Sequence, residues 1–170
     1  MNEFENIEKT TLFGRDNIAV FSNRPKSLNE VFRYTIQNYG EKTALILDDE
    51  TLTYNELDEK ASRLAAALQK KYGVAKGDRL FSFIGNRLEF PILIIACAKL
   101  GAVVIPANTK LTTSEISYII EHSKPKLVLV EEELLQVINE CRDQFSEVNE
   151  YTNTIITVGQ STYEHSFTSS

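Results

Sequence analysis

The sequence of 170 residues has little cysteine and little histidine, with two of each. Cys97 and Cys141 are far apart in the chain, and neither belongs to a CxxC motif or lies near a histidine. The cysteines therefore predict neither a metal site nor a redox pair. We interpret them as small buried side chains of a protein from a reducing compartment.

Long apolar segments are also missing. The longest, FPILIIACA at 90–98, is followed by Lys99, whereas a membrane-spanning helix needs about 20 apolar residues. The first ten residues, MNEFENIEKT, lack the apolar core of a signal peptide. We therefore expect a soluble, cytoplasmic protein without a transmembrane segment.

An excess of basic residues is absent as well. The chain has 24 acidic and 18 basic side chains, which gives a net charge of −6. This balance provides no electrostatic footprint for nucleic acid or for an anionic membrane. The composition, 42% apolar and 25% charged, is typical of a globular protein, and the length suits one domain.

The sequence lacks the common short motifs of catalysis and phosphate binding, namely GxGxxG, GxxxxGK[ST], HExxH and GxSxG. His122 is predicted to lie at the C-terminal end of a helix, where a structural role suits it. The acidic residues 48–50 are interpreted as a solvated turn, and those at 131–133 as a charged helix N-terminus. From the residues alone we predict no catalytic residue and no metal ligand.

Short apolar runs alternate with amphipathic segments along most of the chain. Strands are predicted at 43–47, 51–54, 79–84, 103–105, 126–130 and 154–158, with helices between most of them and one before the first. Capping boxes are predicted to begin three helices, at Ser27 with Glu30, Thr53 with Glu56, and Thr112 with Glu115. This alternation predicts an α/β fold with a mostly parallel sheet and helices on both faces.

The predicted organisation has three parts. Residues 1–26 are expected to form an irregular N-terminal arm, residues 27–158 the α/β unit, and residues 159–170 a polar tail. In the helix that runs to Gly101, a face of mostly small residues is predicted to pack on the sheet, formed by Ile94, Cys97, Ala98 and Gly101.

Three segments together resemble the adenylate-forming, AMP-binding enzymes, a superfamily that includes acyl-CoA synthetases, luciferase and peptide-synthetase adenylation domains. LTYNEL at 52–57 is similar to the family pattern L-[ST]-Y-x-E-L. The segment 77–112, which includes KLGAVVIPANTKL, is similar to K-x-G-A-x-x-x-P-x-N-x-x-L and the elements before it. SEISYIIEHSKPKLVLV at 114–130 is similar to a third family segment. The resemblance covers about residues 27–158.

The resemblance implies that the α/β unit is part of the large N-terminal domain of an adenylate-forming enzyme. It implies an AMP-forming acid–CoA ligase, which converts a carboxylic acid, ATP and CoA to acyl-CoA, AMP and pyrophosphate through an acyl-adenylate, with Mg as the metal. Asn108 is similar to the residue of acyl-CoA synthetases, whereas amino-acid adenylation domains more often have aspartate there. A fatty acid is therefore the favoured substrate.

Several parts that the family requires are missing: the complete phosphate loop, the adenine and ribose sites, and the C-terminal lysine. We therefore expect the chain to be the N-terminal piece of a longer polypeptide, inactive alone and without a cofactor of its own. Its expected partners are the rest of that polypeptide and a small carboxylic acid. With its neighbours removed, the sheet is expected to expose an apolar patch and to self-associate.

Two interpretations of the tail stay open, and so do two alternatives to the ligase function. FTSS at 167–170 matches the start of the phosphate loop, which would make Thr168 and Ser169 cofactor-binding residues, but a tail rich in serine and threonine can match by chance. The chain could instead be a non-catalytic α/β interaction module. It could also belong to an adenylation domain for an amino or aryl acid.

Overall fold

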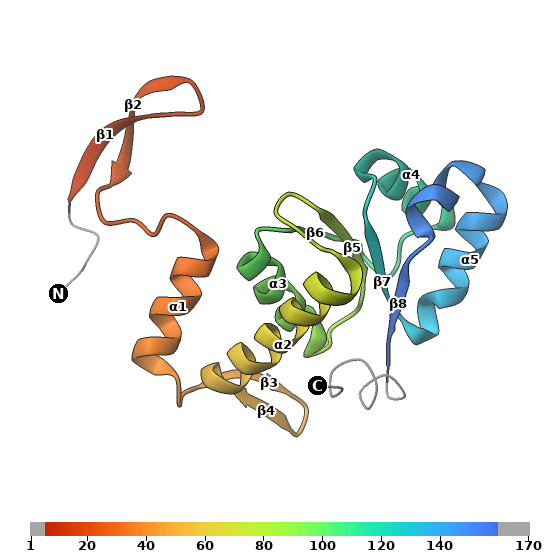
Figure 1. The fold of residues 1–170 in the computed structure, drawn as a ribbon, viewed down its shortest axis with the longest axis horizontal. Coiled ribbons are helices and arrows are strands. Elements are labelled where there is room, and N and C mark those ends of the chain that lie inside the picture. Colours follow the sequence, from red (N-terminus) through yellow and green to blue (C-terminus); the bar gives the residue numbers. More distant parts are fainter. Residues whose placement is uncertain (1–5, 160–170) are drawn as a thin grey trace.

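The computed structural model describes residues 6–159, which form an elongated molecule with a parallel sheet flanked by helices and an N-terminal extension at one end (Figure 1). The strands are β1 (Ile7–Leu12), β2 (Arg15–Phe21), β3 (Thr43–Leu47), β4 (Glu50–Thr53), β5 (Arg79–Phe83), β6 (Val103–Pro106), β7 (Leu127–Glu131) and β8 (Ile155–Val158). The helices are α1 (Leu28–Tyr39), α2 (Tyr54–Tyr72), α3 (Glu89–Leu100), α4 (Thr113–Ser123) and α5 (Leu135–Gln144), with short 3₁₀ segments η1 (Glu132–Leu134) and η2 (Ser146–Thr152).

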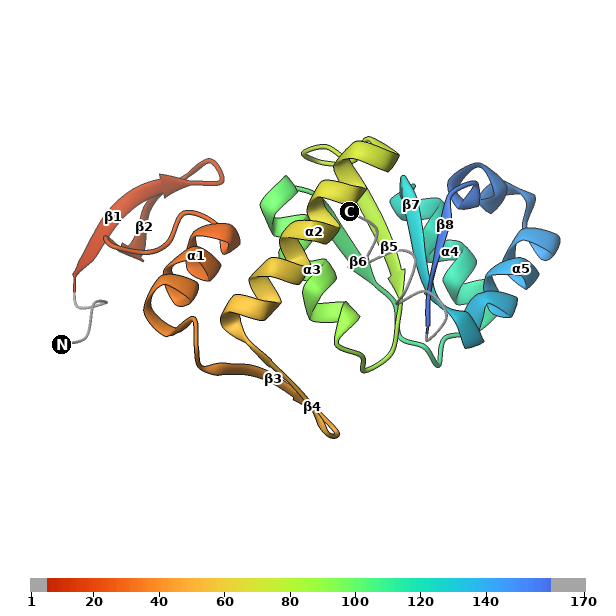
Figure 2. The same cartoon turned by 60° about the horizontal axis from the view of Figure 1, so that its bottom comes forward.

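The central sheet has four parallel strands in the order β6-β5-β7-β8. Successive side chains of a strand point to opposite faces, and both faces are apolar here. Leu80 of β5 belongs to the core under α2 and α3, while its neighbour Phe81 belongs to the core under α4 and α5. The prediction of a parallel sheet with helices on both faces is therefore confirmed, and Figure 2 shows the two helical layers.

Two details of the packing differ from the predictions. The apolar run at 103–105 predicts a buried strand, but β6 is an edge strand, and Val103 is exposed. The predicted packing face of α3 is confirmed only at Cys97, since Ile94 and Ala98 are half-buried and Gly101 is exposed. The buried residues of α3 are Glu89, Ile92, Leu93, Ile95, Ala96 and Cys97. A helix that is apolar on nearly every side has no period from which its buried face can be determined.

The sequence predicted an irregular N-terminal arm, and this prediction is wrong. The arm contains an antiparallel hairpin of β1 and β2. Its turn places Phe13 and Gly14 at φ of 53° and 72°, the positive angles that two-residue hairpin turns of type I′ require. The prediction failed because phenylalanine is an unusual residue at that position. The limits of the three predicted parts stay a prediction, and residues 160–170 of the polar tail lie outside the described residues.

The capping boxes fix where the helices begin. Thr53 accepts a hydrogen bond from the Glu56 amide, and the Glu56 carboxylate accepts one from the Thr53 amide at 2.8 Å. The Glu115 carboxylate accepts the Thr112 amide at the same distance. At α1 the Glu30 carboxylate accepts a hydrogen bond from the Lys26 amide and not from the Ser27 amide, so the box is shifted by one residue. Two of the three predicted boxes are thus confirmed in full.

These caps give the chain a specific response to acid. The Thr53 amide lowers the pKa of Glu56, and the Thr112 amide lowers that of Glu115. Their stabilisation is therefore fully present above the ordinary glutamate pKa of about 4.3 and is lost as the pH falls through the lowered folded values. In urea unfolding, we expect an E56Q/E115Q variant to lose less stability than the wild type between about pH 5 and pH 3. If the free energies of unfolding of the two proteins fell equally over this pH range, this account would be contradicted.

No helix among residues 6–159 is long and apolar enough to cross a membrane.

Candidate functional site

The strand order determines where a crevice can form in this sheet. Numbered from β5, the order is 2-1-3-4, so the chain leaves the adjacent strands β5 and β7 toward opposite faces of the sheet. α3, which follows β5, packs in one core, and α5, which follows β7, packs in the other. In open parallel sheets such a switch point, at the carboxyl ends of the strands, is where ligands commonly bind. The end of β5 and β7 is therefore the candidate site.

A pocket of about 470 Å³ lies at this position. It is lined by the turn between β3 and β4, the segment between β5 and α3, and the last residue of β7. The lining residues are Leu47, Asp48, Glu50, Asn86, Arg87, Leu88, Glu89 and Glu131. The pocket is thus built from three segments that are distant in the sequence.

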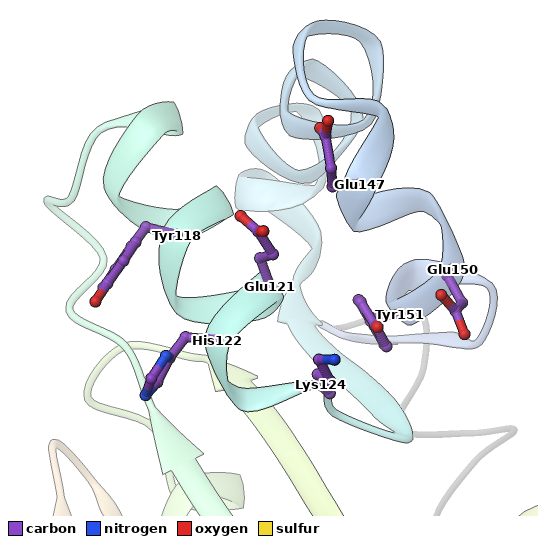
Figure 3. Close-up of a pocket in the computed structure, with 7 residues that line it drawn as sticks. All are labelled: Tyr118, Glu121, His122, Lys124, Glu147, Glu150 and Tyr151. Atoms are coloured by element: carbon purple, nitrogen blue, oxygen red, sulfur yellow. The ribbon is translucent and has the colours of Figure 1, made fainter.

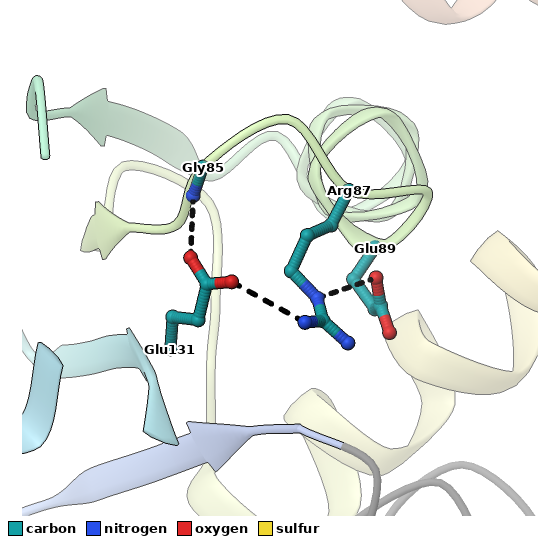
Figure 4. A network of polar contacts seen from close by, with 4 residues as sticks. All are labelled: Gly85, Arg87, Glu89 and Glu131. Carbon is teal, nitrogen blue, oxygen red and sulfur yellow. Dashed lines mark hydrogen bonds and ion pairs between the residues drawn. The ribbon is translucent and has the colours of Figure 1, made fainter. Parts of the chain in front are cut away.

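A polar network centred on Arg87 fixes one wall of this pocket (Figure 4). The Glu131 carboxylate accepts the Gly85 amide at 3.0 Å and Nη1 of Arg87 at 3.2 Å. Nε of Arg87 donates to Glu89 at 3.3 Å. The side chains of Arg87, Glu89 and Glu131 are 26%, 6% and 19% exposed, so the network is largely shielded from water.

Gly85 allows this close approach. A Cβ atom at that position would lie 3.1 Å from Oε2 of Glu131, so a side chain there would push the carboxylate away from the amide. Burial disfavours the charged guanidinium of Arg87, but hydrogen bonds to Glu89 and Glu131 outweigh it and raise its pKa. The network therefore holds the loop after β5 in one position relative to β7.

The chemistry available at this site is limited. Four carboxylates and one guanidinium line the pocket, a balance that disfavours a polyphosphate. Among residues 6–159, no cluster of three or more histidine, cysteine, aspartate or glutamate side chains is arranged to hold a metal ion. The described residues that line this pocket thus position the loop after β5 and form no cationic cradle for a polyphosphate.

A second groove, of about 520 Å³, lies between α4 and η2 (Figure 3). Its lining residues are Tyr118, Glu121, His122, Lys124, Glu147, Glu150 and Tyr151. His122 lies in the last turn of α4, as predicted, and its ring stacks on that of Tyr118 with the centroids 5.8 Å apart. Among the described residues that line this groove there is no serine, threonine or cysteine, so none of these nucleophiles lies beside His122 within the described part of the chain.

The other residues named from the sequence have structural positions. Asn108 accepts the Lys110 amide through Oδ1 at 2.9 Å, a local turn that an aspartate could form equally well. Asp48 and Asp49 form the turn between β3 and β4, as expected. Glu131 was expected at a helix N-terminus but ends β7. Thr168 and Ser169 lie outside the described residues.

The sequence reasoning missed the network of Arg87, Glu89 and Glu131. Its one signal was a charged residue directly after the apolar run LVLV at 127–130, which places that charge at the carboxyl end of a buried strand. Its partners lie more than 40 positions earlier in the chain, and only the pairing of β5 with β7 brings them together.

Both cysteines are buried, on opposite faces of the sheet. Burial raises the pKa of Cys97 to about 12 and is also the main cause of the raised pKa of Cys141. Because the thiolate is the reactive form, we expect iodoacetamide to modify neither residue in the folded chain at pH 8, and both after unfolding in urea. Rapid modification of either thiol in the folded chain, measured by mass spectrometry, would contradict this packing.

The fold and the switch-point crevice define an open parallel α/β domain, and comparison with known proteins identifies its family. Residues 32–167 match the model of the AMP-binding enzyme family. The chain belongs to this family, as the sequence resemblance predicted.

Characterised relatives include two ligases. The chain is 32% identical over 114 residues to fatty acid–[acyl-carrier-protein] ligase ScoC of Streptomyces coeruleorubidus, covering 66% of this chain and 22% of the relative. It is 38% identical over 96 residues to 2-succinylbenzoate–CoA ligase of Bacillus licheniformis, covering 56% and 20%. The chain thus spans about a fifth of the length of these relatives.

A solved structure supports the fold assignment. The inhibitor-bound N-terminal domain of FACL13 from Mycobacterium tuberculosis has a TM-score of 0.72 and 30% identity to this chain. The match covers 79% of this chain and 34% of that domain. The prediction that the α/β unit resembles part of the N-terminal domain of an adenylate-forming enzyme is therefore confirmed.

Proposed function

We propose that the chain is the N-terminal part of an AMP-forming acid–CoA ligase. The complete enzyme joins a carboxylic acid to AMP with Mg-ATP, releases pyrophosphate, and transfers the acyl group to CoA. The observation that carries the proposal is the family match over residues 32–167, together with ligase relatives of which the chain spans about a fifth.

The described residues have a supporting role in this proposal. Residues 27–158 form the first subdomain, and the Arg87 network positions the loop after β5. Thr168 and Ser169 are proposed as the first residues of a phosphate loop, in which amides and hydroxyls approach the triphosphate. The remaining ATP, Mg and CoA groups belong to the part of the polypeptide after residue 170.

The favoured substrate is a fatty acid. The fatty-acid ligase ScoC supports this substrate. The similarity to 2-succinylbenzoate–CoA ligase makes an aryl acid the alternative substrate. The direct experiment measures acid-dependent exchange of labelled pyrophosphate into ATP by the full-length polypeptide, with fatty, aryl and amino acids in parallel. Exchange that depends on a fatty acid is expected. Exchange only with an amino or aryl acid would overturn the substrate, and none with any acid would overturn the ligase.

A carrier protein is the second candidate acceptor, because ScoC transfers to an acyl-carrier protein. Thioester formation with CoA and with a pantetheinylated carrier protein separates the two. We expect CoA to be the better acceptor, and a thioester found only on the carrier protein would reverse the assignment.

The isolated chain 1–170 is expected to be inactive in the same exchange assay, since the described residues provide no cradle for a triphosphate. The matched control is the full-length polypeptide at equal concentration. Acyl-adenylate or pyrophosphate formed by the isolated chain would contradict this expectation.

A further inference from the structure

The groove between the end of α4 and η2 is separate from the pocket at the switch point. It has a volume of about 520 Å³ and shares no lining residue with the pocket around Arg87. Its volume lies in the range that is typical of ligand sites, and no step of the proposed ligase reaction uses it. We call it the α4–η2 groove.

Aromatic rings line both sides of this groove. Figure 3 shows Tyr118 and His122 on one side of the end of α4, and Tyr151 of η2 on the other side. The Tyr118 ring stacks on the His122 ring at an interplanar angle of 11°, yet Tyr118 is 66% exposed. The stacking fixes the ring of Tyr118 while most of its surface stays available to a partner.

The two walls are held in place by the core under α4 and α5. Ile120 of α4 and Val148 of η2 are almost completely buried in that core. The Thr152 hydroxyl donates to the carbonyl of Val148 at 2.9 Å, which closes the last turn of η2. The groove is therefore preformed, and a partner would pay little conformational entropy to order it.

The groove carries negative charge that the described residues do not neutralise. Three carboxylates, of Glu121, Glu147 and Glu150, line it together with the single ammonium of Lys124. Within residues 6–159, none of the three glutamates takes part in an ion pair. Nζ of Lys124 instead lies 5.9 Å from the centroid of the Tyr151 ring. Since the C-terminal end of α4 adds the negative end of a helix dipole, the groove attracts cations.

Arginine is the cation that suits both the rings and the carboxylates. A guanidinium is planar, so it can stack on a tyrosine ring and donate paired hydrogen bonds to a carboxylate. The ammonium of lysine is a compact point charge and offers no such plane. A second copy of this chain is disfavoured as the partner, because the net charge of −6 makes two copies repel each other.

We propose that the α4–η2 groove is the docking site for an extended basic segment of another protein. The segment places an arginine side chain on the Tyr118 ring and against the groove carboxylates. Tyrosine and arginine are the residue types that most often anchor protein interfaces. The inference does not depend on the ligase assignment, since it uses only residues of the groove.

The test measures binding of two fluorescein-labelled peptides to the full-length polypeptide by fluorescence anisotropy. The peptides are Gly-Arg-Arg-Gly-Arg-Arg-Gly and its lysine counterpart, which carry the same charge. We expect the arginine peptide to bind at least ~3-fold more tightly, because a guanidinium stacks on an aromatic ring more favourably than an ammonium. The variant Y118L keeps an apolar side chain but removes the ring, and it should abolish this preference.

Two charge variants locate the binding site. E121Q/E150Q removes two groove carboxylates at nearly constant shape, whereas the matched control E8Q/D49N removes two exposed carboxylates from β1 and the β3–β4 turn, far from the groove (Figure 1). We expect E121Q/E150Q to weaken binding of the arginine peptide at least ~5-fold. In about 0.15 M salt, which screens distant charges, E8Q/D49N should change it less than ~2-fold. All four positions are exposed, and circular dichroism checks that each variant is folded.

Several results would overturn the proposal. No binding of the arginine peptide, or equal losses in the two charge variants, would show that the groove is not a docking site. Equal binding of the two peptides by the wild type would rule out recognition of a guanidinium. If the wild type dimerised in sedimentation and E121Q/E150Q did not, a second copy would be the occupant. Pyrophosphate exchange should be unchanged in E121Q/E150Q, so loss of either activity is distinguishable from loss of the other.

Discussion

Replacement of Phe81 by alanine is expected to lower the free energy of unfolding of the chain by about 3–5 kcal/mol. Phe81 is fully buried in β5, in the core under α4 and α5, with its ring centroid 6.4 Å from that of Phe83. Alanine removes the packing of the ring and leaves a cavity that a central strand, paired on both sides, cannot collapse to fill. Urea unfolding followed by circular dichroism measures the loss.

The control for this substitution is the same change at Phe13. That ring is 96% exposed at the turn of the β1–β2 hairpin, so F13A is expected to change the free energy of unfolding by less than about 0.5 kcal/mol. Equal effects of F81A and F13A would contradict the assignment of the core to the two faces of the central sheet.

Replacement of Arg87 by leucine is expected to lower the free energy of unfolding by about 2–4 kcal/mol, because it removes the cation that faces two shielded carboxylates. Glu89 is almost completely buried, and Glu131 would keep only its hydrogen bond from Gly85. The loop after β5 would lose its link to β7. Besides the free energy of unfolding, hydrogen exchange of residues 84–88 should therefore increase in R87L.

The matched control is R63L on α2. Arg63 pairs with Glu59 on the surface, and both side chains are more than 60% exposed. Such exposed ion pairs contribute little to stability. The free energy of unfolding of R63L should therefore stay within about 0.5 kcal/mol of the wild-type value. If R63L were as destabilising as R87L, the shielding of the Arg87 network would not be the cause.

The central sheet could be predicted from the sequence because its signals are local. The run KLVLV at 126–130 is a buried strand by composition alone, and β7 follows it within one residue. Thr53 with Glu56 and Thr112 with Glu115 determine helix starts through contacts three residues apart. Local signals of this kind do not depend on the rest of the fold.

The features that the sequence did not predict depend on contacts between distant parts of the chain. FPILIIACA is apolar on nearly every side, so the buried face of α3 depends on α2, against which it packs. The β1–β2 hairpin pairs strands across a turn that begins with Phe13, a residue that does not signal a turn. Glu131 acquires its partners only when β7 pairs with β5. Each of these features is determined by tertiary contacts.

The measurement that tests the account most directly is the coding sequence of the source gene beyond codon 170. We predict that it continues into a glycine-rich phosphate loop that begins at Thr168 and Ser169, and then into a region several times the length of this chain. A stop directly after Ser170 would contradict the ligase assignment and would favour a non-catalytic α/β interaction module.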